Sequence, residues 1–377
     1  VYSSFTIINQ VLFIIGISII LIHSILIMYH SKYLKKESEY KYSHKVDSIL
    51  IYVQFVSKFI IIITAPFAFM FMFKQIQYVM TNGYQSYFLT TSKDMGINAI
   101  VNQLETLFRV AIAMYFATYP KRKQLRNAIR LYIIYTLLYL GVGDRTNLAV
   151  LFMMLIWYFS EYKKKYSLVG KNSRSFNLKV RIKIIILGVV LLFVFSIWNE
   201  IRYSFATGIG VSVSNSNISL IIDFLSSQGR SYNTVLKALR INKIGILTIN
   251  DRLVMLFQPL LHQLEGMSLN IFNLEFPREQ GGFMFTKVPS SADLISIFTN
   301  ASIYSSGGGL GTSYLAEGIL LGGYFGVLIT SLIVSAIIIF ASYNRKDNYW
   351  KRSFVIFSFM YIMRLPRDYT LGILAFF

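Results

Sequence analysis

The chain consists largely of apolar blocks that are long enough to cross a lipid bilayer. They lie at residues 5–29, 48–73, 99–118, 131–142, 146–160, 184–199, 312–343 and 353–377. A helix needs about 20 apolar residues to span ~30 Å of hydrocarbon. Only 14% of the residues are charged, against roughly 25% in an average soluble domain. The pattern predicts an all-α polytopic integral membrane protein with about 8–9 transmembrane segments.

Positive charge gathers in the short connections between these blocks. Segments 30–47, 119–130, 161–183 and 344–352 hold 22 of the 37 Lys and Arg residues, but only five of the 17 acidic residues. An excess of Lys and Arg in short loops marks the cytosolic side of a membrane protein. We therefore interpret the net charge of +20 as a sign of topology, and we expect no nucleic-acid partner.

Alternation across the membrane makes the remaining connections external. These are residues 74–98, the turn Gly141–Arg145 and a long connection at 200–311. We thus expect transmembrane helices in 1–199, one large external loop in 200–311, and C-terminal transmembrane helices in 312–377. Because residue 1 would lie outside and an apolar run is still open at residue 377, we expect the natural chain to extend beyond both ends.

The large loop is predicted to be mostly helical. Apolar residues recur at helical spacing in Ile218–Ser227, Ser231–Asn242 and Asp251–Glu265, with Ser231 and Asp251 placed as N-caps. Residues 268–311 are richer in Gly, Pro, Ser and Asn, and we expect an ordered loop there.

Two of the apolar blocks are irregular. Residues 312–343 would form a helix of about 48 Å, so either its first turns project outside or it breaks near Gly322-Gly323. Residues 353–377 are interrupted by Pro366, which removes a helix hydrogen bond. There we expect a short outward helix, an external turn and the start of a returning helix.

Two external groups of residues carry arginines. In the turn Gly143-Asp144-Arg145, Arg145 can meet an anion beside the N-terminus of the next helix; alternatively, Asp144 caps that helix and Arg145 reaches lipid headgroups. Arg364 and Arg367 flank the break at Pro366. Paired guanidinium groups suit phosphate oxygens, whereas simple snorkelling is the alternative.

The third group contains a carboxylate at the start of a helix. Glu317 follows the glycine-rich run Gly307–Gly311, which has no P-loop Lys and follows no strand, so it is neither a P-loop nor a dinucleotide-binding motif. Glu317 is a candidate general base at the mouth of a cavity. The alternative is a charge placed favourably at the positive end of the helix dipole.

The remaining chemistry is sparse. Arg202, Arg278 and Asp293 are external, and each can join a site or be a solvated charge. Glu105 and Arg109, four residues apart, are predicted to form a buried structural pair. The chain has no Cys, which excludes thiolate chemistry and disulfides. Only one His falls in an external segment, so we expect no metal site and no cofactor.

The glycine-rich segment resembles a known family. Residues 308–317, read as Gly-Gly-Leu-Gly-Thr-Ser-Tyr-Leu-Ala-Glu, and the following 322–327 resemble motifs of the bacterial O-antigen and capsule repeat-unit polymerases, the Wzy family. The turn at Gly143-Asp144-Arg145, the break at Pro366-Arg367-Asp368 and Gln228-Gly229-Arg230-Ser231 also look alike. Gly318 departs from the pattern, since an aromatic or aliphatic residue is commoner there.

The resemblance implies a glycosyltransferase in the bacterial cell membrane, with its active site outside the cytoplasm. Such an enzyme transfers a growing glycan from undecaprenyl pyrophosphate to the next lipid-linked repeat unit, without nucleotide sugar or metal. It implies partners: the lipid-linked oligosaccharide, the bilayer, a chain-length regulator and a flippase. Glu317 is then the first candidate for the base and Asp293 the second. The candidate pyrophosphate ligands are Arg145, Arg364, Arg367, Arg202 and Arg278.

Two other functions fit parts of the same pattern. A glycan ligase of similar architecture differs only in its acceptor. A lipid-linked oligosaccharide flippase binds the same ligand, but it is expected to show symmetric halves and a polar path through the membrane, whereas the charges here gather at one face.

Overall fold

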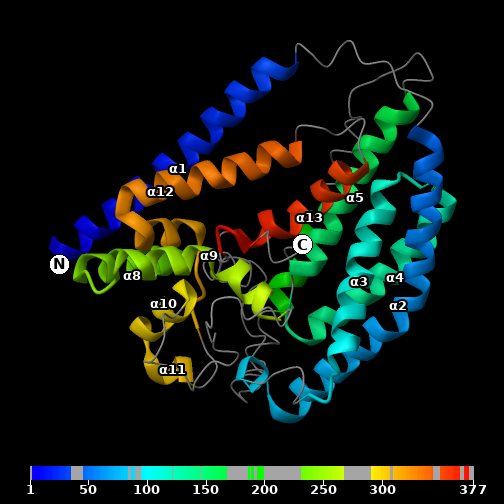
Figure 1. Cartoon of the computed structure of the whole chain (residues 1–377). Helices are drawn as coiled ribbons and strands as arrows, with labels where there is room; N and C mark the ends of the chain where they lie inside the picture. The colour runs from blue at the N-terminus through cyan, green and yellow to red at the C-terminus, as the bar shows by residue number, and fades with distance from the viewer. Residues whose placement is uncertain are drawn as a thin grey trace. The chain divides into compact units, whose positions relative to one another are not determined.

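The computed structural model describes residues 2–34, 46–83, 86–89, 95–120, 122–144, 146–167, 186, 188–190, 193–198, 231–266, 290–305, 309–342, 349–365 and 369–372. Within these residues every regular element is helical (Figure 1). The chain divides into two compact units. Unit 1 contains residues 1–44 and 229–377, and unit 2 contains residues 45–228.

The helices of unit 1 come from both ends of the chain. They are α1 (Tyr2–Leu34), α8 (Ser231–Ile244), α9 (Ile249–Gly266), α10 (Ser291–Thr299), α11 (Ala301–Ser305), α12 (Tyr314–Ser342) and α13 (Tyr349–Arg364). Those of unit 2 are α2 (Val46–Asn82), the short 3₁₀ helix η2 (Ser86–Leu89), α3 (Ala99–Ala117), α4 (Arg122–Gly141) and α5 (Thr146–Ser167).

Among the described residues, three helices are long and apolar enough to cross a membrane. The stretches are Asn9–Tyr29 in α1, Leu50–Asn82 in α2 and Tyr314–Phe340 in α12. Helices of this length and apolar composition are typical of a membrane protein, and the regular elements of the described residues are all helical. The larger number of segments and the external loop stay predictions. Helices do form at the predicted blocks of α3, α4, α5 and α13.

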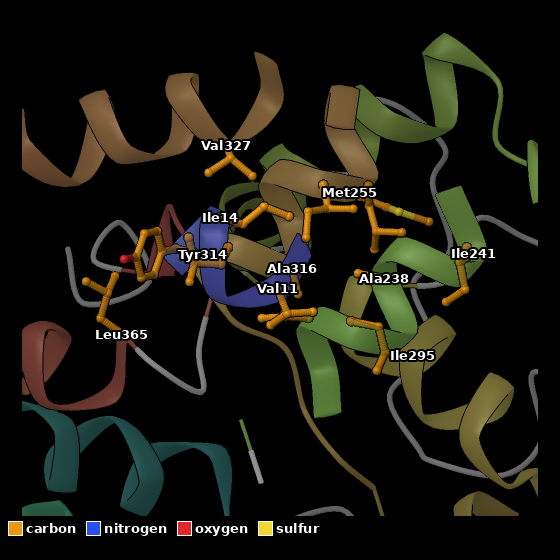
Figure 2. Close-up of a cluster of buried hydrophobic side chains, with 14 of the residues drawn as sticks. Val11, Ile14, Ala238, Ile241, Met255, Ile295, Tyr314, Ala316, Val327 and Leu365 are labelled. Atoms are coloured by element: carbon orange, nitrogen blue, oxygen red, sulfur yellow. The ribbon is translucent and has the colours of Figure 1, made fainter. Parts of the chain in front are cut away.

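The core of unit 1 joins α1 to helices from the second half of the chain. Its members are Val11, Ile14, Val235, Ala238, Ile241, Met255, Leu294, Ile295, Tyr314, Leu315, Ala316, Ile319, Leu320, Val327, Val334, Tyr361 and Leu365. Figure 2 shows side chains of α1, α8, α10 and α12 converging in this cluster. The helices α8 to α10, which were predicted to lie in the external loop, therefore pack as part of one core with two apolar helices.

The helix α12 breaks sharply near its first third. Gly322 and Gly323 leave helical geometry, and Gly323 has φ +60° and ψ −133°, a left-handed region that favours glycine. The chain turns back there, so that Gly318 lies against Val327. A break at this place was one of the two outcomes predicted for residues 312–343.

The break divides α12 into a short arm before Gly322 and a long arm after Gly323. Two glycines allow these two arms to approach closely. A Cβ on Gly326 would lie 1.9 Å from the carbonyl oxygen of Gly318, and a Cβ on Gly318 would lie 2.7 Å from the Cα of Val327. Neither position therefore has room for a side chain. This contact explains why residue 318 is glycine in this chain, where the resembled family more often has a larger residue.

The helix α1 is hydrogen-bonded to both arms of α12. The hydroxyl of Ser18 lies 3.0 Å from the hydroxyl of Tyr314 and 2.7 Å from that of Ser331. Tyr314 begins the short arm and Ser331 belongs to the long one. All three residues are buried, so this polar contact holds the two arms at one level of α1.

Unit 2 contains the predicted ion pair. Arg109 Nη2 donates to Glu105 Oε2 at 2.9 Å, and its Nε lies 2.9 Å from Oε1. Tyr139 donates to Oε1 at 2.8 Å, and Tyr135 also donates to that oxygen. Glu105 is buried. The prediction of a buried structural pair is confirmed, and the two tyrosines of α4 complete the coordination of the carboxylate.

Several local predictions were wrong. The basic segment 119–130 is not only a loop, because α4 begins at Arg122. In α9 the cap is Thr248 rather than Asp251: Asp251 N donates to Thr248 Oγ1 at 3.2 Å, while Thr248 N donates to Asp251 Oδ2 at 2.9 Å. The two residues form a reciprocal capping box. The predicted loop 268–311 contains α10 and α11, and the predicted helix Ile218–Ser227 lies outside the described residues.

Candidate functional site

Glu317 lies in the first turns of the short arm of α12. The Ser313 hydroxyl accepts the N–H of Ala316 at 3.1 Å, and the Ser313 carbonyl accepts the N–H of Glu317 at 2.9 Å. Ser313 is therefore the N-cap of the helix. The positive end of the helix dipole faces the carboxylate of Glu317, as one of the two sequence interpretations expected.

The carboxylate of Glu317 is buried, with 3% of the residue exposed. Its Oε1 accepts from the Ser291 hydroxyl at 3.1 Å, and its Oε2 accepts from the backbone N–H of Thr370 at 2.6 Å. The Ser291 hydroxyl also lies 3.0 Å from Oγ1 of Thr312. A carboxylate inside a protein needs such donors because burial removes its hydration.

A small cavity lies beside this carboxylate. Its lining residues are Arg252, Met255, Leu256, Ser291, Glu317, Leu320 and Leu321. Its volume of about 10 Å³ is close to the space that one water molecule occupies. The cavity therefore gives Glu317 a small neighbouring space, with both polar and apolar residues around it.

Arg252 of α9 is another residue that lines this cavity. The sequence did not single it out as a site residue. Its Nη1 donates to the carbonyl of Leu320 at 2.6 Å and to Oδ1 of Asn242 at 2.8 Å. Leu320 precedes the break in α12, where helix carbonyls lose their partners in the following turn. Arg252 replaces one of those partners. The predicted break in α12 is the sequence signal that could have indicated the need for a donor from another helix.

Thr370 links Glu317 to the C-terminal break. The carbonyl of Thr370 accepts from the hydroxyl of Tyr361 at 2.6 Å, while its N–H is bound by Glu317. Leu365, on the other side of Pro366, is buried in the core of unit 1. Within the described part of the chain no group hydrogen-bonds the buried Oγ1 of Thr370.

Asp293, the second candidate base, lies in the first turn of α10. Its N–H donates to the Ser290 hydroxyl at 2.9 Å, and that hydroxyl lies 2.5 Å from Oδ2. Its Oδ1 accepts from Tyr304 at 2.9 Å. Burial and the adjacent carboxylate raise the pKa of Tyr304, which keeps this hydroxyl protonated as a donor. Both oxygens of Asp293 thus serve local structure.

The predicted arginines are only partly described. Arg364 is the last residue of α13 and is partly buried. Arg145, Arg202, Arg278 and Arg367 lie outside the described residues. Next to Arg145, Asp144 accepts from the N–H of Thr146 at 2.8 Å and from the side chain of Asn147 at 3.0 Å, which confirms Asp144 as the cap of α5.

One hydrogen bond in unit 1 ties Glu317 to the chain just beyond the second predicted group. The bond between Glu317 and Thr370 joins the glycine-rich segment to the chain that follows Pro366-Arg367-Asp368. The turn at Asp144 belongs to unit 2. Among the described residues no group of His, Asp and Glu side chains has the arrangement of a metal site. The site thus offers a buried carboxylate, a hydroxyl pair and a nearby guanidinium.

Comparison with known proteins identifies the family. No curated protein and no solved structure matches the chain. The family model described as "O-antigen polysaccharide polymerase Wzy" matches residues 1–377. Part of the segment that suggested the resemblance builds the break in α12, and Glu317 itself belongs to that segment. The chain belongs to the O-antigen polysaccharide polymerase Wzy family.

Proposed function

We propose that this protein polymerises lipid-linked oligosaccharide repeat units into O-antigen or capsular polysaccharide. The observation that carries the proposal is the match of the Wzy family along the whole chain. In our proposal the substrate carrier is undecaprenyl pyrophosphate, and the site faces outward across the bacterial cell membrane. A chain-length regulator and a flippase would be its partners. The reaction would use neither metal nor nucleotide.

The proposed reaction transfers a glycan between two lipid-linked substrates. An acceptor hydroxyl of the incoming repeat unit attacks the anomeric carbon of the growing chain, and a new C–O bond forms. The bond from that carbon to the pyrophosphate oxygen breaks, and its electron pair leaves with the lipid pyrophosphate. The proton of the hydroxyl passes to a carboxylate acting as general base.

Glu317 is the base in this proposal, with Asp293 as the second candidate. Glu317 is supported by its place beside a cavity and by its two donors, which orient the carboxylate. The oxygens of Asp293 are engaged by Ser290 and Tyr304. The cavity at Glu317 has room for about one water molecule, so the acceptor hydroxyl would enter where that water fits.

Arginines would bind the pyrophosphate in this proposal. Negative charge builds up on the leaving group, and fixed cations stabilise it more in the transition state than in the ground state. Arg364 and Arg367 flank the turn that Thr370 ties to Glu317, which supports them first. Arg145 is proposed from the sequence turn that begins α5, and Arg202 and Arg278 as secondary ligands.

The test is reconstitution of the purified protein with a lipid-linked repeat unit, in EDTA and without nucleotide. We expect a ladder of products spaced by one repeat unit. Arg367→Ala and Arg145→Ala should each lower the rate at unchanged expression, whereas Arg240→Ala, an exposed position on α8, should leave it unchanged. Full activity in Arg145→Ala, Arg367→Ala and Glu317→Ala alike would show that the site is elsewhere.

Two other outcomes would replace the proposal. Transport of the repeat unit across a proteoliposome membrane, without any ladder, would indicate a flippase. Transfer of the glycan only when a non-carrier acceptor is supplied would indicate a ligase.

A further inference from the structure

An open groove lies between α4 and α5 in unit 2. Its lining residues are Leu125, Arg126, Ile129 and Arg130 of α4, and Phe159 of α5. Its volume is about 420 Å³, within the range of small-molecule sites. The proposed polymerase reaction uses none of these residues. All of these residues belong to unit 2, so the groove is formed by that unit alone.

Contacts between the middle of α5 and the residues just before α4 lie close to the groove in sequence. The hydroxyl of Tyr158 donates to the carbonyl of Pro120 at 2.5 Å. The ring of Trp157 stacks on that of Tyr119, with centroids 5.4 Å apart. These contacts fix the residues on both sides of the groove, because Phe159 directly follows Tyr158 and Leu125 lies one turn into α4. These contacts therefore hold α5 in place against the chain that leads into α4.

The groove combines one sign of charge with an apolar floor. Arg126 and Arg130 are exposed and four residues apart on α4, so they are neighbours on one helix face and repel each other. The helix α4 contains no acidic residue, and the segment 119–130 adds three more basic residues. Phe159 is 40% exposed. An anion between the two guanidinium groups would relieve the repulsion, and an apolar chain would cover Phe159.

The groove lies at the end of an apolar span. Gln54 donates to Gln124 at 3.3 Å, and Gln54 is four residues beyond Leu50, where the apolar stretch Leu50–Asn82 begins. Gln124 directly precedes the groove residues Leu125 and Arg126. Gln124 is thus beside the first turns of this apolar stretch, and Arg126 follows two residues later on α4. Long basic side chains near the end of an apolar helix can reach phospholipid headgroups.

We propose that this groove binds an anionic phospholipid of the surrounding bilayer. Its phosphate lies between Arg126 and Arg130, where guanidinium groups bind phosphate oxygens bidentately. One acyl chain lies along Ile129 and Phe159. The anionic headgroup gives selectivity over phosphatidylcholine, because a headgroup with its own cation gains less from two arginines. The site needs no substrate of the proposed reaction, so the test does not depend on that function.

The test uses quenching of Trp157 by brominated lipids. Trp198→Phe and Trp350→Phe leave Trp157 as the remaining indole among the three in the chain. The protein, in mixed micelles of a neutral detergent, is titrated with dibrominated phosphatidylglycerol or dibrominated phosphatidylcholine. We expect saturable quenching by phosphatidylglycerol at a midpoint at least tenfold below that for phosphatidylcholine.

Three variants separate the site from general electrostatic attraction. Arg126→Gln with Arg130→Gln should raise the phosphatidylglycerol midpoint about 30-fold, taking ~1 kcal/mol for each basic residue at the surface. Arg126→Lys with Arg130→Lys retains the charge but not the bidentate geometry, so it should lose some binding, but less than the Gln variant. Arg240→Gln with Lys243→Gln, two exposed positions of α8, removes the same charge elsewhere and should leave the midpoint unchanged.

Four results would overturn the proposal. They are equal midpoints for the two lipids, an unchanged midpoint in the Arg126→Gln/Arg130→Gln variant, an equal loss in the α8 control, and displacement of phosphatidylglycerol by a lower concentration of a polyprenyl pyrophosphate. The last result would assign the groove to a lipid-linked sugar carrier instead of a membrane phospholipid.

Discussion

The backbone N–H of Thr370 donates to the carboxylate of Glu317 at 2.6 Å, across 53 residues of sequence. The same residue accepts a hydrogen bond from Tyr361 through its carbonyl. Thr370 is thus held on both sides, by the last helix of unit 1 and by the glutamate of the broken helix. The position of Glu317 and the position of the chain after Pro366 cannot change independently.

Glu317→Gln should abolish polymerisation while preserving the fold. The amide oxygen of Gln can accept from Thr370, and its NH₂ group can donate to the Ser291 hydroxyl, so both contacts survive. Only the ability to take a proton is lost, which typically costs about 100-fold or more in rate. The measurement is the initial rate of ladder formation together with the thermal unfolding midpoint in detergent.

Glu317→Ala is the comparison for that experiment. It leaves the buried N–H of Thr370 without its acceptor, which costs about 1–3 kcal/mol, so both activity and unfolding temperature should fall. If Glu317→Gln retains activity and Asp293→Asn loses it at an unchanged unfolding temperature, the base is Asp293.

Arg252→Met should destabilise unit 1 by about 1.5–3 kcal/mol, the usual range for a hydrogen bond to a charged group. Methionine keeps the apolar part of the side chain but leaves the carbonyl of Leu320 without its donor. Arg240→Met is the matched control, because Arg240 is exposed and surface substitutions change stability by about 0.5 kcal/mol or less. Equal unfolding temperatures for the two variants would show that Leu320 needs no donor from Arg252.

Gly326→Ala should prevent the two arms of α12 from packing. The added methyl would meet the carbonyl of Gly318 at 1.9 Å, and overpacking of this severity costs about 3 kcal/mol or more. Gly322→Ala is the control, since nothing lies within 4 Å of a Cβ at that position. The folded fraction recovered from detergent extracts by size-exclusion chromatography distinguishes them, and equal recovery would contradict the close approach of the arms.

Arg109→Met should destabilise unit 2 by about 3 kcal/mol, because it leaves the buried carboxylate of Glu105 without its cation. Adding Glu105→Gln should restore about half of that loss. The amide needs no counter-ion and still accepts hydrogen bonds from Tyr135 and Tyr139. Thermal unfolding of both single variants and the double variant gives the coupling energy. Simple additivity would mean that the two residues do not act as a pair.

The features that local sequence determines were predicted well. Hydropathy located the apolar helices, i,i+4 spacing paired Glu105 with Arg109, and two adjacent glycines made a break in α12 one of the two predicted outcomes. Each depends on residues within one or two turns of one another. The capping box at Thr248 was missed because either of two polar residues can begin that helix, and only the backbone geometry distinguishes them.

The contacts that assemble the site depend on residues far apart in the chain. Nothing in the sequence near Thr370 shows that its N–H meets Glu317, since a backbone group has no side-chain signature. Arg252 looks like any solvated charge on an amphipathic helix until the break in α12 exposes the carbonyl of Leu320. Helices α10 and α11 were hidden by a Ser- and Gly-rich composition, and they are stabilised despite it because α10 packs against α8 and α12 and α11 packs against α10.

The reversal of α12 also fixes how far along the long arm the short arm reaches. Val327 lies four residues beyond Gly323, or about 6 Å along the long arm at 1.5 Å per residue, and Gly318 is in contact with it. Glu317, the neighbour of Gly318, is consequently set at a fixed depth along an apolar helix instead of at its tip. In the reaction that we propose, two lipid-borne substrates would meet at that depth, and the distance from Gly323 to Val327 would set how far each carrier has to raise or lower its sugar.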